Sequence, residues 1–244
     1  TIDAPVKRLG AGTVAGSLAV KSFLVERPIE PLGLGSVDAR SLEIDFEATE
    51  DGLTFRKAAL DAKGLTASGS GSLLGGRVDA QLKLHSAAWR GPKTLPVAGG
   101  SVDLAGTLYG DASQPAGLAF DGELRIAGAR SAFESASFAV NGGEARATLN
   151  GSGPFADPMR WVRSGSVELA GATVARAKAT ALPVEHLSAA FVRDGQTFRV
   201  SDAKLSIAGA VASGDGEWSP EQHRVNFTAS AGDLASFGVA LPPS

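Results

Sequence analysis

Two stretches of this chain carry one pattern: LEIDFEATEDGLTFRKAALDAKGLTASGSG (residues 42–71) and LSAAFVRDGQTFRVSDAKLSIAGAVASGDG (residues 187–216). Leu42 and Phe46 recur 145 positions later as Leu187 and Phe191. The triplet Thr-Phe-Arg at 54–56 recurs at 197–199, an offset of 143, and Arg-Val at 77–78 recurs at 224–225, an offset of 147. Every change of offset is two residues. Because side chains alternate along a β-strand with a period of two, such a slip keeps each side chain on its own face, so the pattern predicts a repeated, half-buried strand unit.

A fainter third copy is expected between these two, with chance similarity in a chain rich in Ala, Gly and Leu as the alternative. At an offset of 78 the matched pairs are Leu42 with Phe120, Phe46 with Leu124, and Phe55 with Phe133. Units of this length exceed those of the common short repeats, so each is expected to hold several strands. The prediction is a single elongated β domain over residues 1–244, with units at about 16–98, 99–160 and 161–234.

Alternation of apolar and polar residues predicts strands along most of the chain. The clearest example is RVDAQLKL at 77–84, where apolar residues alternate with Arg, Asp, Gln and Lys. Turns are predicted at 50–52 (Glu-Asp-Gly), 121–122 (Asp-Gly) and 141–142 (Asn-Gly), the last as a two-residue hairpin. The alternation breaks at 154–163, which suggests a crossover or short helical turn, and residues 233–237 suggest one further helical turn.

Composition narrows the class of protein. The formal net charge is −3, with 23 Lys and Arg against 26 Asp and Glu, which argues against a nucleic-acid binder because that class normally carries a basic stripe. The chain has no Cys, so it forms neither disulfides nor thiolate metal sites. It contains no apolar run near the ~18 residues of a membrane-spanning helix. The chain begins at Thr1 without a signal peptide, which we interpret as a mature chain or a segment of a longer protein.

Catalytic or metal chemistry is not predicted. The three histidines, His85, His186 and His223, lack the spacing of a zinc site and are expected on the surface. Alternation places Glu43, Asp45 and Glu47 on an outward polar face rather than around a cation. The Asp-Gly pairs are interpreted as turns because no calcium-ligand series surrounds them. We therefore expect no enzyme activity, no catalytic residues, no metal and no cofactor.

A repeated meander with one apolar face can close as a barrel, pair as a sandwich, or curl into an open trough. Many inward positions are Ala, Val or Leu and few are Phe, so filling an interior to native density would be difficult. We therefore predict an all-β fold: a repeated antiparallel meander curled into an open hydrophobic groove, with few or no helices.

The order of motifs resembles the C-terminal region of AsmA-like proteins and their TamB-type relatives. A Gly-Ser-apolar strand (16–20 and 165–169) precedes the Gly-x-Thr-Phe-Arg motif, which is followed by Ala-Ser-Gly-x-Gly and by an alternating strand that ends in Ala-Ser-Ala-Gly-Asp-Leu (229–234). The resemblance covers about residues 16–234 and rests on glycines and apolar spacings. It implies a taco-shaped sheet in the periplasm of the Gram-negative envelope, an anchor outside this segment, and a role in moving phospholipid between membranes or in outer-membrane assembly.

The expected function is a lipid-handling module whose ligand is a phospholipid. Its acyl chains would lie on the inward apolar residues Leu42, Ile44, Phe46, Leu53, Phe55, Val78, Leu82, Leu84, Leu187, Phe191, Phe198, Leu205, Ile207, Val225 and Phe227. Two alternatives remain open: each of these residues could be ordinary core, and the protein could be a structural or adhesive repeat module with a filled core. That module would bind another envelope protein through open strand edges. Nucleic acid is not an expected partner, and membrane attachment is expected only through segments outside this sequence.

Overall fold

The computed structural model describes residues 2–3, 6–8, 12–25, 37–87, 97–114, 117–133, 138–153, 162–176 and 181–232. These residues form strands and the short connections between them, and no α-helix lies among them. The strands, in chain order, are β1 (Ile2–Asp3), β2 (Val6–Arg8), β3 (Val14–Val25), β4 (Val37–Thr49), β5 (Gly52–Ala62), β6 (Leu65–Leu74), β7 (Arg77–Ser86), β8 (Val97–Ala98), β9 (Ser101–Asp111), β10 (Ala119–Ala127), β11 (Arg130–Phe133), β12 (Phe138–Ser152), β13 (Val162–Arg176), β14 (Leu182–Asp194), β15 (Thr197–Ile207), β16 (Ala210–Trp218) and β17 (His223–Ala231).

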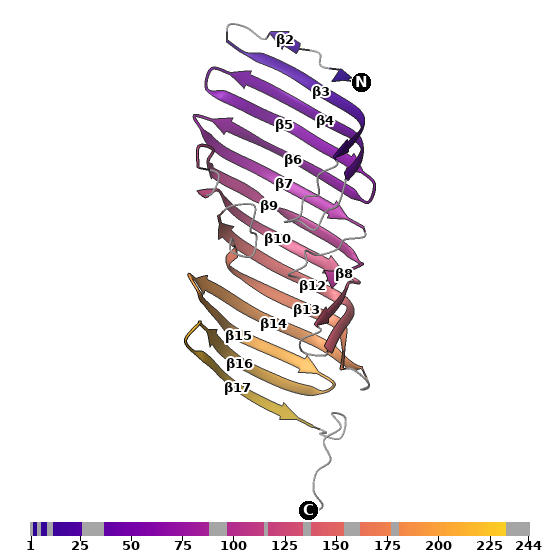
Figure 1. Ribbon diagram of the computed structural model, residues 1–244, viewed down its shortest axis with the longest axis vertical. Helices are drawn as coiled ribbons and strands as arrows, with labels where there is room; N and C mark the ends of the chain where they lie inside the picture. Colours follow the sequence, from indigo (N-terminus) through magenta and orange to yellow (C-terminus); the bar gives the residue numbers. More distant parts are fainter. Residues whose placement is uncertain are drawn as a thin grey trace, which may run out of the picture.

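All of these strands belong to one antiparallel sheet. Its long strands pair in the order β3, β4, β5, β6, β7, β9, β10, β12, β13, β14, β15, β16 and β17 (Figure 1). The short strands β1 and β2 pair with the outer edge of β3, and β8 and β11 continue the lines of β9 and β10. Among the described residues, β17 pairs only with β16, so the sheet is open rather than closed into a barrel.

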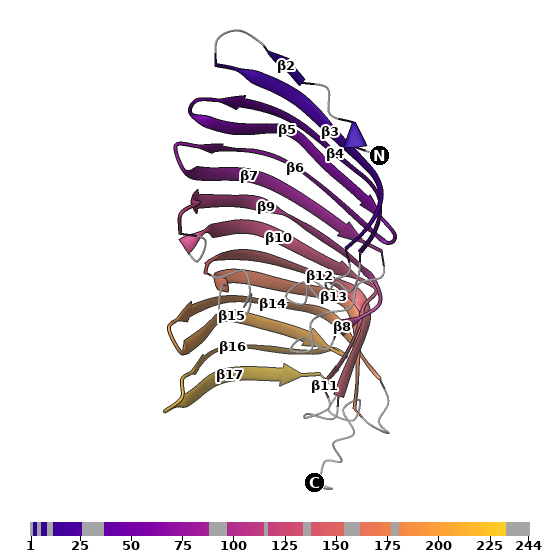
Figure 2. The ribbon, with the colours of Figure 1, turned by 45° about the horizontal axis from the view of Figure 1, so that its top comes forward.

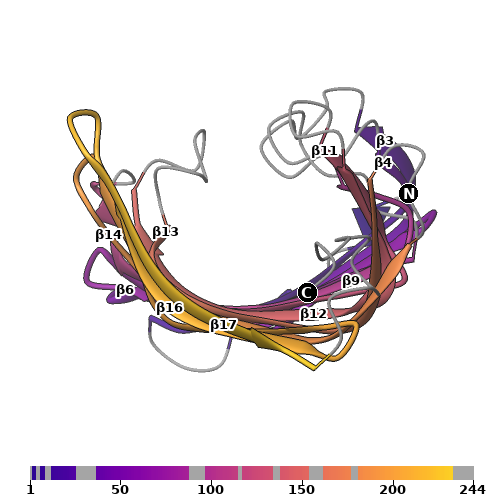
Figure 3. The same cartoon turned by 90° about the horizontal axis from the view of Figure 1, so that it is seen from below.

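The sheet is strongly curved along the direction of its strands, so the long strands follow the cross-section of a trough (Figure 3). Viewed along its long axis it is a trough with two walls and an open side (Figure 3). The strands themselves bend along their length, most clearly β3 and β4 (Figure 2). The predicted fold class is therefore confirmed: the protein is all-β, an antiparallel meander curled into an open groove.

Residues with a positive φ lie within several strands at a similar distance across the sheet. Ser22 in β3 and Gly171 in β13 both have a positive φ, of 54° and 66°, and neither has a partner in the strand register. Gly142 and Gly143 lie on the same line within β12, with φ of 68° and 76°. The register is the same on both sides of these residues, so none of them is an extra residue in its strand. The extra residues at this level are Arg40 in β4 and Glu185 in β14, where the pairing with the next strand shifts by one.

The hairpin predicted at Asn141 and Gly142 is wrong. β12 runs through both residues without reversing, and its first part pairs with β11 while its second part pairs with β10. Gly142 has the positive φ that a tight hairpin also needs, but here it lies within one continuous strand.

The turn predicted at Asp121 and Gly122 is also wrong, whereas the turn at Glu50 and Asp51 is confirmed. Gly122 lies in the middle of β10. It lacks a side chain because the ring of Phe120 occupies that space: a Cβ on Gly122 would lie 2.5 Å from two ring carbons. The crossover or helical turn predicted at 154–163 falls outside the described residues except for Val162 and Arg163, which begin β13, and the helical turn predicted at 233–237 falls wholly outside them.

The outer pair of sequence copies forms corresponding strands. β4–β7 and β14–β17 match at a constant offset of 145 in strand register, as shown by the turn pairs Thr49/Gly52 and Asp194/Thr197. The bulges recur as well: Arg40 corresponds to Glu185, and the bulge at Arg56 and Lys57 corresponds to that at Ser201 and Asp202. The offsets of 143 and 147 are therefore two-residue slips of a motif along its strand, not changes in strand length.

The middle copy does not correspond structurally. Phe46 and Phe55 lie on adjacent strands joined by a hairpin, whereas their proposed counterparts Leu124 and Phe133 lie on β10 and on its continuation β11. In addition, β4 and β10 are separated by an odd number of steps in the meander and so run in opposite directions. The matches at an offset of 78 reflect shared alternation and not a repeated unit.

Burial is greatest on the inner side of the bend. The buried residues there are small or aliphatic and follow one another in cross-strand register, as Ala39, Ala62, Leu65, Ser86 and Val102 do from β4 to β9. Val37, Ala39, Ala62 and Leu65 form a cluster against which Phe23, Leu60 and Leu84 pack. The core is thus a corner of the trough, and the wider sheet has the described strands in a single layer.

Candidate apolar binding face

One face of the sheet is apolar from β3 to β17, and we call it the apolar face. Directly paired residues share a face, so the register alone defines it. One row reads Val20, Leu42, Leu60, Ala67, Leu84, Leu104, Leu124, Ala147, Val167 and Ala189. With strands about 4.8 Å apart, the face extends for roughly 60 Å.

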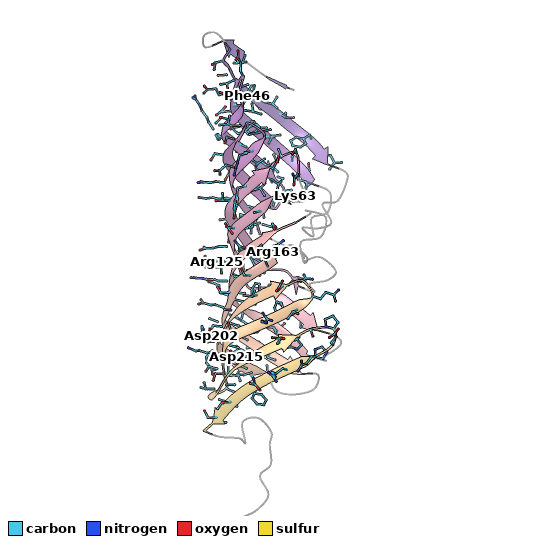
Figure 4. All side chains as sticks on the ribbon, turned by 90° about the vertical axis from the view of Figure 1, so that its left-hand side faces the viewer. Phe46, Lys63, Arg125, Arg163, Asp202 and Asp215 are labelled. Carbon is cyan, nitrogen blue, oxygen red and sulfur yellow. The ribbon has the colours of Figure 1, made fainter. Side chains whose placement is uncertain are left out.

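The apolar face is the concave side of the trough. The bend packs its buried residues on this face, and the ionised side chains alternate with them to the other side. Figure 4 shows Arg125, Asp202 and Asp215 along the convex side. The groove therefore has an apolar lining and a charged exterior.

The side chains predicted from the sequence to face the groove all lie on this face. The register aligns Phe46 directly with Phe55, and Leu187 directly with Leu205. It also brings in residues from the middle of the chain that were not among the predicted lipid-binding residues, namely Leu104, Leu108, Phe120, Leu124, Leu149, Val167 and Leu169. The signal that would have found them was the alternation itself, which continues through β9, β10, β12 and β13 without the repeated motif.

Aromatic rings on the apolar face lie over glycines on their own or neighbouring strands. The ring of Phe120 covers Gly106 and Gly122, the ring of Phe191 covers Gly165, and the indole of Trp218 covers Gly216. An added Cβ at these glycines would come within 2.2–2.8 Å of the ring atoms. The rings therefore lie along the sheet surface, which keeps the lining shallow instead of filling the trough.

The phenylalanines of the apolar face differ widely in exposure. Phe120 is only 4% exposed, whereas Phe198 is 39% and Phe227 is 75% exposed. Phe198 stacks on Phe191 with ring centroids 5.8 Å apart and lies 6.2 Å from Trp218. Large apolar side chains are thus available at the surface of the C-terminal strands.

The total surface of the molecule agrees with a single layer. The accessible area is 15646 Å² for a mass of 24.7 kDa, whereas a folded monomer of that mass normally exposes roughly 10,000 Å². No large side chain among the described residues is fully buried. Exposed large apolar side chains, among them Leu82, Phe198 and Phe227, are typical of a surface that binds a ligand or a partner.

The convex face is tied together by cross-strand polar pairs. Arg125 and Arg146 both donate to Glu144, at 2.7 and 2.6 Å, and these bonds lower the pKa of Glu144. Lys57 donates to Glu43 at 3.0 Å, which raises the lysine pKa, and Arg199 donates to Glu217 at 2.9 Å, which raises the arginine pKa. Exposed pairs of this kind stabilise a fold only modestly, but they keep the charges on the outer side.

The described residues contain no group of His, Asp and Glu side chains arranged to hold a metal ion. His85 lies on the convex face with Nδ1 2.7 Å from Asp103 Oδ1. No helix within the described ranges is long and apolar enough to cross a bilayer. The feature best suited to bind something is therefore the apolar face.

No protein-family model, no curated protein and no solved structure matches this chain.

Proposed function

We propose that this protein is a lipid-handling module of the Gram-negative cell envelope, similar to AsmA-like and TamB-type proteins, which holds phospholipid acyl chains on its apolar face. In this role the chain acts in the periplasm and either carries phospholipid between membranes or supports outer-membrane assembly. The observation that carries the proposal is the continuity of the apolar face, which the strand register traces from β3 to β17.

The apolar face supplies the affinity that acyl chains need. Each buried CH₂ contributes about 0.8 kcal/mol, so a chain of ordinary length is held without polar recognition. The open side of the trough lets the head group stay in water while the acyl chains lie on residues such as Leu82, which is 42% exposed. Because the rows repeat across the strands, a chain would meet equivalent surroundings at each step along the groove.

The second candidate is a structural module that binds a protein partner through a strand edge. One observation favours it: residues 222–230 are all exposed, so β17 presents an edge able to pair with another strand. The filled core of that alternative finds no support, because the described strands form one layer. We therefore keep lipid binding as the main proposal.

The test compares two variants of β7 that differ by one position. Leu82→Glu places a carboxylate on the apolar face, and Gln81→Glu places the same group on the convex face of the same strand. Each protein is isolated from bacterial membranes, and its bound lipid is extracted and quantified by mass spectrometry.

We expect phospholipid with the wild type and with Gln81→Glu, and a severalfold loss with Leu82→Glu. Circular dichroism and chemical denaturation establish that both variants are folded. Wild-type protein free of lipid, or equal lipid in the two variants, would refute the proposal.

A further inference from the structure

The two outer edges of the sheet differ in how they are covered. At one end, β1 and β2 pair with the outer edge of β3, at residues 19–20 and 14–16. At the other end, β17 pairs with β16 along its whole length, and among the described residues no strand pairs with its other side (Figure 1). We call this free side the β17 edge.

The β17 edge lacks most of the features that keep edge strands from pairing with other chains. The strand, HRVNFTASA at residues 223–231, contains no Pro and no Lys, and its pairing with β16 has no bulge. Arg224 is its one side chain that is charged at neutral pH, and it lies at the start of the strand. Such an edge is suited to bind an extended segment through backbone hydrogen bonds.

The internal repeat shows what occupies the corresponding edge in the first copy. At the offset of 145, β17 corresponds to β7, and β16, which pairs with its inner side, corresponds to β6. The other side of β7 pairs with β9, antiparallel, from Arg77 with Asp111 to Ser86 with Val102. Because the two copies share their turns and bulges, a strand with the geometry of β9 fits beside β17.

Phe227 of β17 indicates the sequence of the strand that fits. Its counterpart Leu82 lies between two glycines, Gly69 on β6 and Gly106 on β9. Phe227 has Gly214 of β16 on its inner side, so a neighbouring strand would supply the second glycine. The Phe227 ring is 75% exposed and is free to lie over that glycine, as other rings on the apolar face lie over theirs.

The residues of β9 around its glycine complete the pattern. Leu104 and Leu108 lie on the apolar face, two positions to either side of Gly106. In the same register, two such residues would lie opposite Ala229 and Val225 of β17. The residues between them fall on the convex face, where polar side chains are favoured.

We propose that the β17 edge binds an extended strand of a partner protein, antiparallel to β17, with Gly opposite Phe227 and apolar residues two positions away on each side. Bound in this way, the partner strand lengthens the sheet and continues the apolar face beyond β17. This inference goes beyond lipid binding and does not depend on it, because backbone pairing supplies the affinity. A second copy of the chain fits less well, because its β3 edge is already paired with β1 and β2.

The first test uses the sequence of β9 as the probe strand. A synthetic peptide of residues 101–111 carries a fluorescent label, and its binding to the full chain is measured by anisotropy. Two further peptides are methylated on alternate backbone nitrogens, one at odd and one at even positions. Since successive N–H groups of a strand point to opposite sides, pairing with β17 tolerates one of these sets and not the other. A fourth peptide carries Gly106→Val.

The second test reads the register by disulfide formation, which is possible because the chain has no Cys. The variant Thr228→Cys is mixed with peptides that carry Asp103→Cys, Ala105→Cys or Thr107→Cys. By the repeat, position 105 lies opposite position 228. The matched control is Ser213→Cys, which lies beside Thr228 on β16, one strand further from the edge.

We expect the unmodified peptide to bind, and one methylated peptide to bind as well as it does. The other methylated peptide loses its backbone hydrogen bonds and should bind more than about tenfold more weakly. Gly106→Val should weaken binding severalfold, although valine favours strands, because its side chain occupies the space of the Phe227 ring. The disulfide should form with Ala105→Cys in preference to the other two peptides, and Ser213→Cys should give little.

A peptide that does not bind, methylated peptides that behave alike, or disulfide yields without a preferred position would overturn the proposal. Tighter binding of the Gly106→Val peptide would overturn the match to Phe227. A wild-type dimer that the peptide dissociates would assign the edge to a second copy and overturn the choice of partner. None of these results bears on lipid bound to the apolar face, so the proposed function stands or fails separately in the comparison of Leu82→Glu with Gln81→Glu.

Discussion

Three phenylalanines on the apolar face differ mainly in how far they are buried, and this difference sets their expected contributions to stability. Phe120 is 4% exposed, Phe198 39% and Phe227 75%. Replacing a fully buried Phe by Ala costs about 4 kcal/mol. Scaling that cost by the buried fraction gives about 4 kcal/mol for Phe120→Ala, about 2.5 kcal/mol for Phe198→Ala and about 1 kcal/mol for Phe227→Ala.

The assay is urea denaturation of the three variants and the wild type, followed by circular dichroism, with the free energy of unfolding taken from midpoint and slope. The surroundings of each ring support the order. The Phe120 ring covers two glycines, so its loss leaves a bare patch that no neighbouring side chain fills. Phe227 faces Gly214 on one side and lies on the edge strand β17.

Lipid binding is expected in the reverse order, because the exposed rings are those that an acyl chain reaches. Phe227→Ala should lower the amount of bound lipid with little change in stability, and Phe120→Ala should do the opposite. A cost for Phe227→Ala equal to that for Phe120→Ala would show that the C-terminal strands pack against a second layer, and the single-layer trough would be refuted.

Three further predictions concern individual sites. Tyr109, the one tyrosine of the chain, donates a hydrogen bond to Asp121 Oδ2 at 2.8 Å, and this bond raises the pKa of the tyrosine. Asp121→Asn should therefore move the absorbance titration of the phenolate to lower pH. An unchanged titration would contradict the contact. The pKa of Glu144 lies below its ordinary value of 4.5, so its contribution to stability is present above that value and is lost as the pH falls through the lowered pKa. In urea midpoints measured from about pH 5 to about pH 3, Glu144→Gln should reduce the acid dependence, and identical slopes would refute the role of Arg125 and Arg146. Gly171 has a φ of 66° with open space around its missing Cβ, so Gly171→Ala should cost about 1 kcal/mol from backbone strain alone. Gly143→Ala should cost more, because its Cβ would lie 2.7 Å from the Ala170 carbonyl oxygen. Denaturation that ranks the two variants in reverse would contradict this geometry.

Alternation was enough to predict the all-β fold and the identity of one apolar face. Leu42, Ile44 and Phe46 face the groove because the residues between them are acidic, and no tertiary information is needed for that step. The choice of a trough over a barrel followed from side-chain size, since Ala and Gly are too small to fill a closed interior.

Glycine was the least predictable residue. Asn141-Gly142 and Asp121-Gly122 have the composition of turns, yet Gly142 is a positive-φ residue within a continuous strand and Gly122 lies beneath an aromatic ring. The local sequence shows only that a glycine occupies such a position. The reason for the glycine depends on which side chain, from the same or another strand, packs over it. Arg193 and His223 were missed for a related reason: both are unremarkable in the sequence, and only the strand register aligns them with Phe198 and Trp218.

The number of strands in the repeat also has a physical basis. An antiparallel meander returns to its starting direction only after an even number of strands, so a duplicated unit preserves its turns, bulges and faces only if it contains an even number. The step from β4 to β14 in the pairing order is an even number of strands, and the two bulges of the first copy recur at the corresponding residues of the second. Repetition of this kind lengthens the trough without altering its cross-section. Added strands do not lengthen a closed sandwich or barrel in this way. They do lengthen an open surface that presents the same apolar lining over a long distance. The architecture therefore suits a ligand that is extended and uniform along its length, as an acyl chain is, better than it suits a compact ligand with a fixed pattern of polar groups.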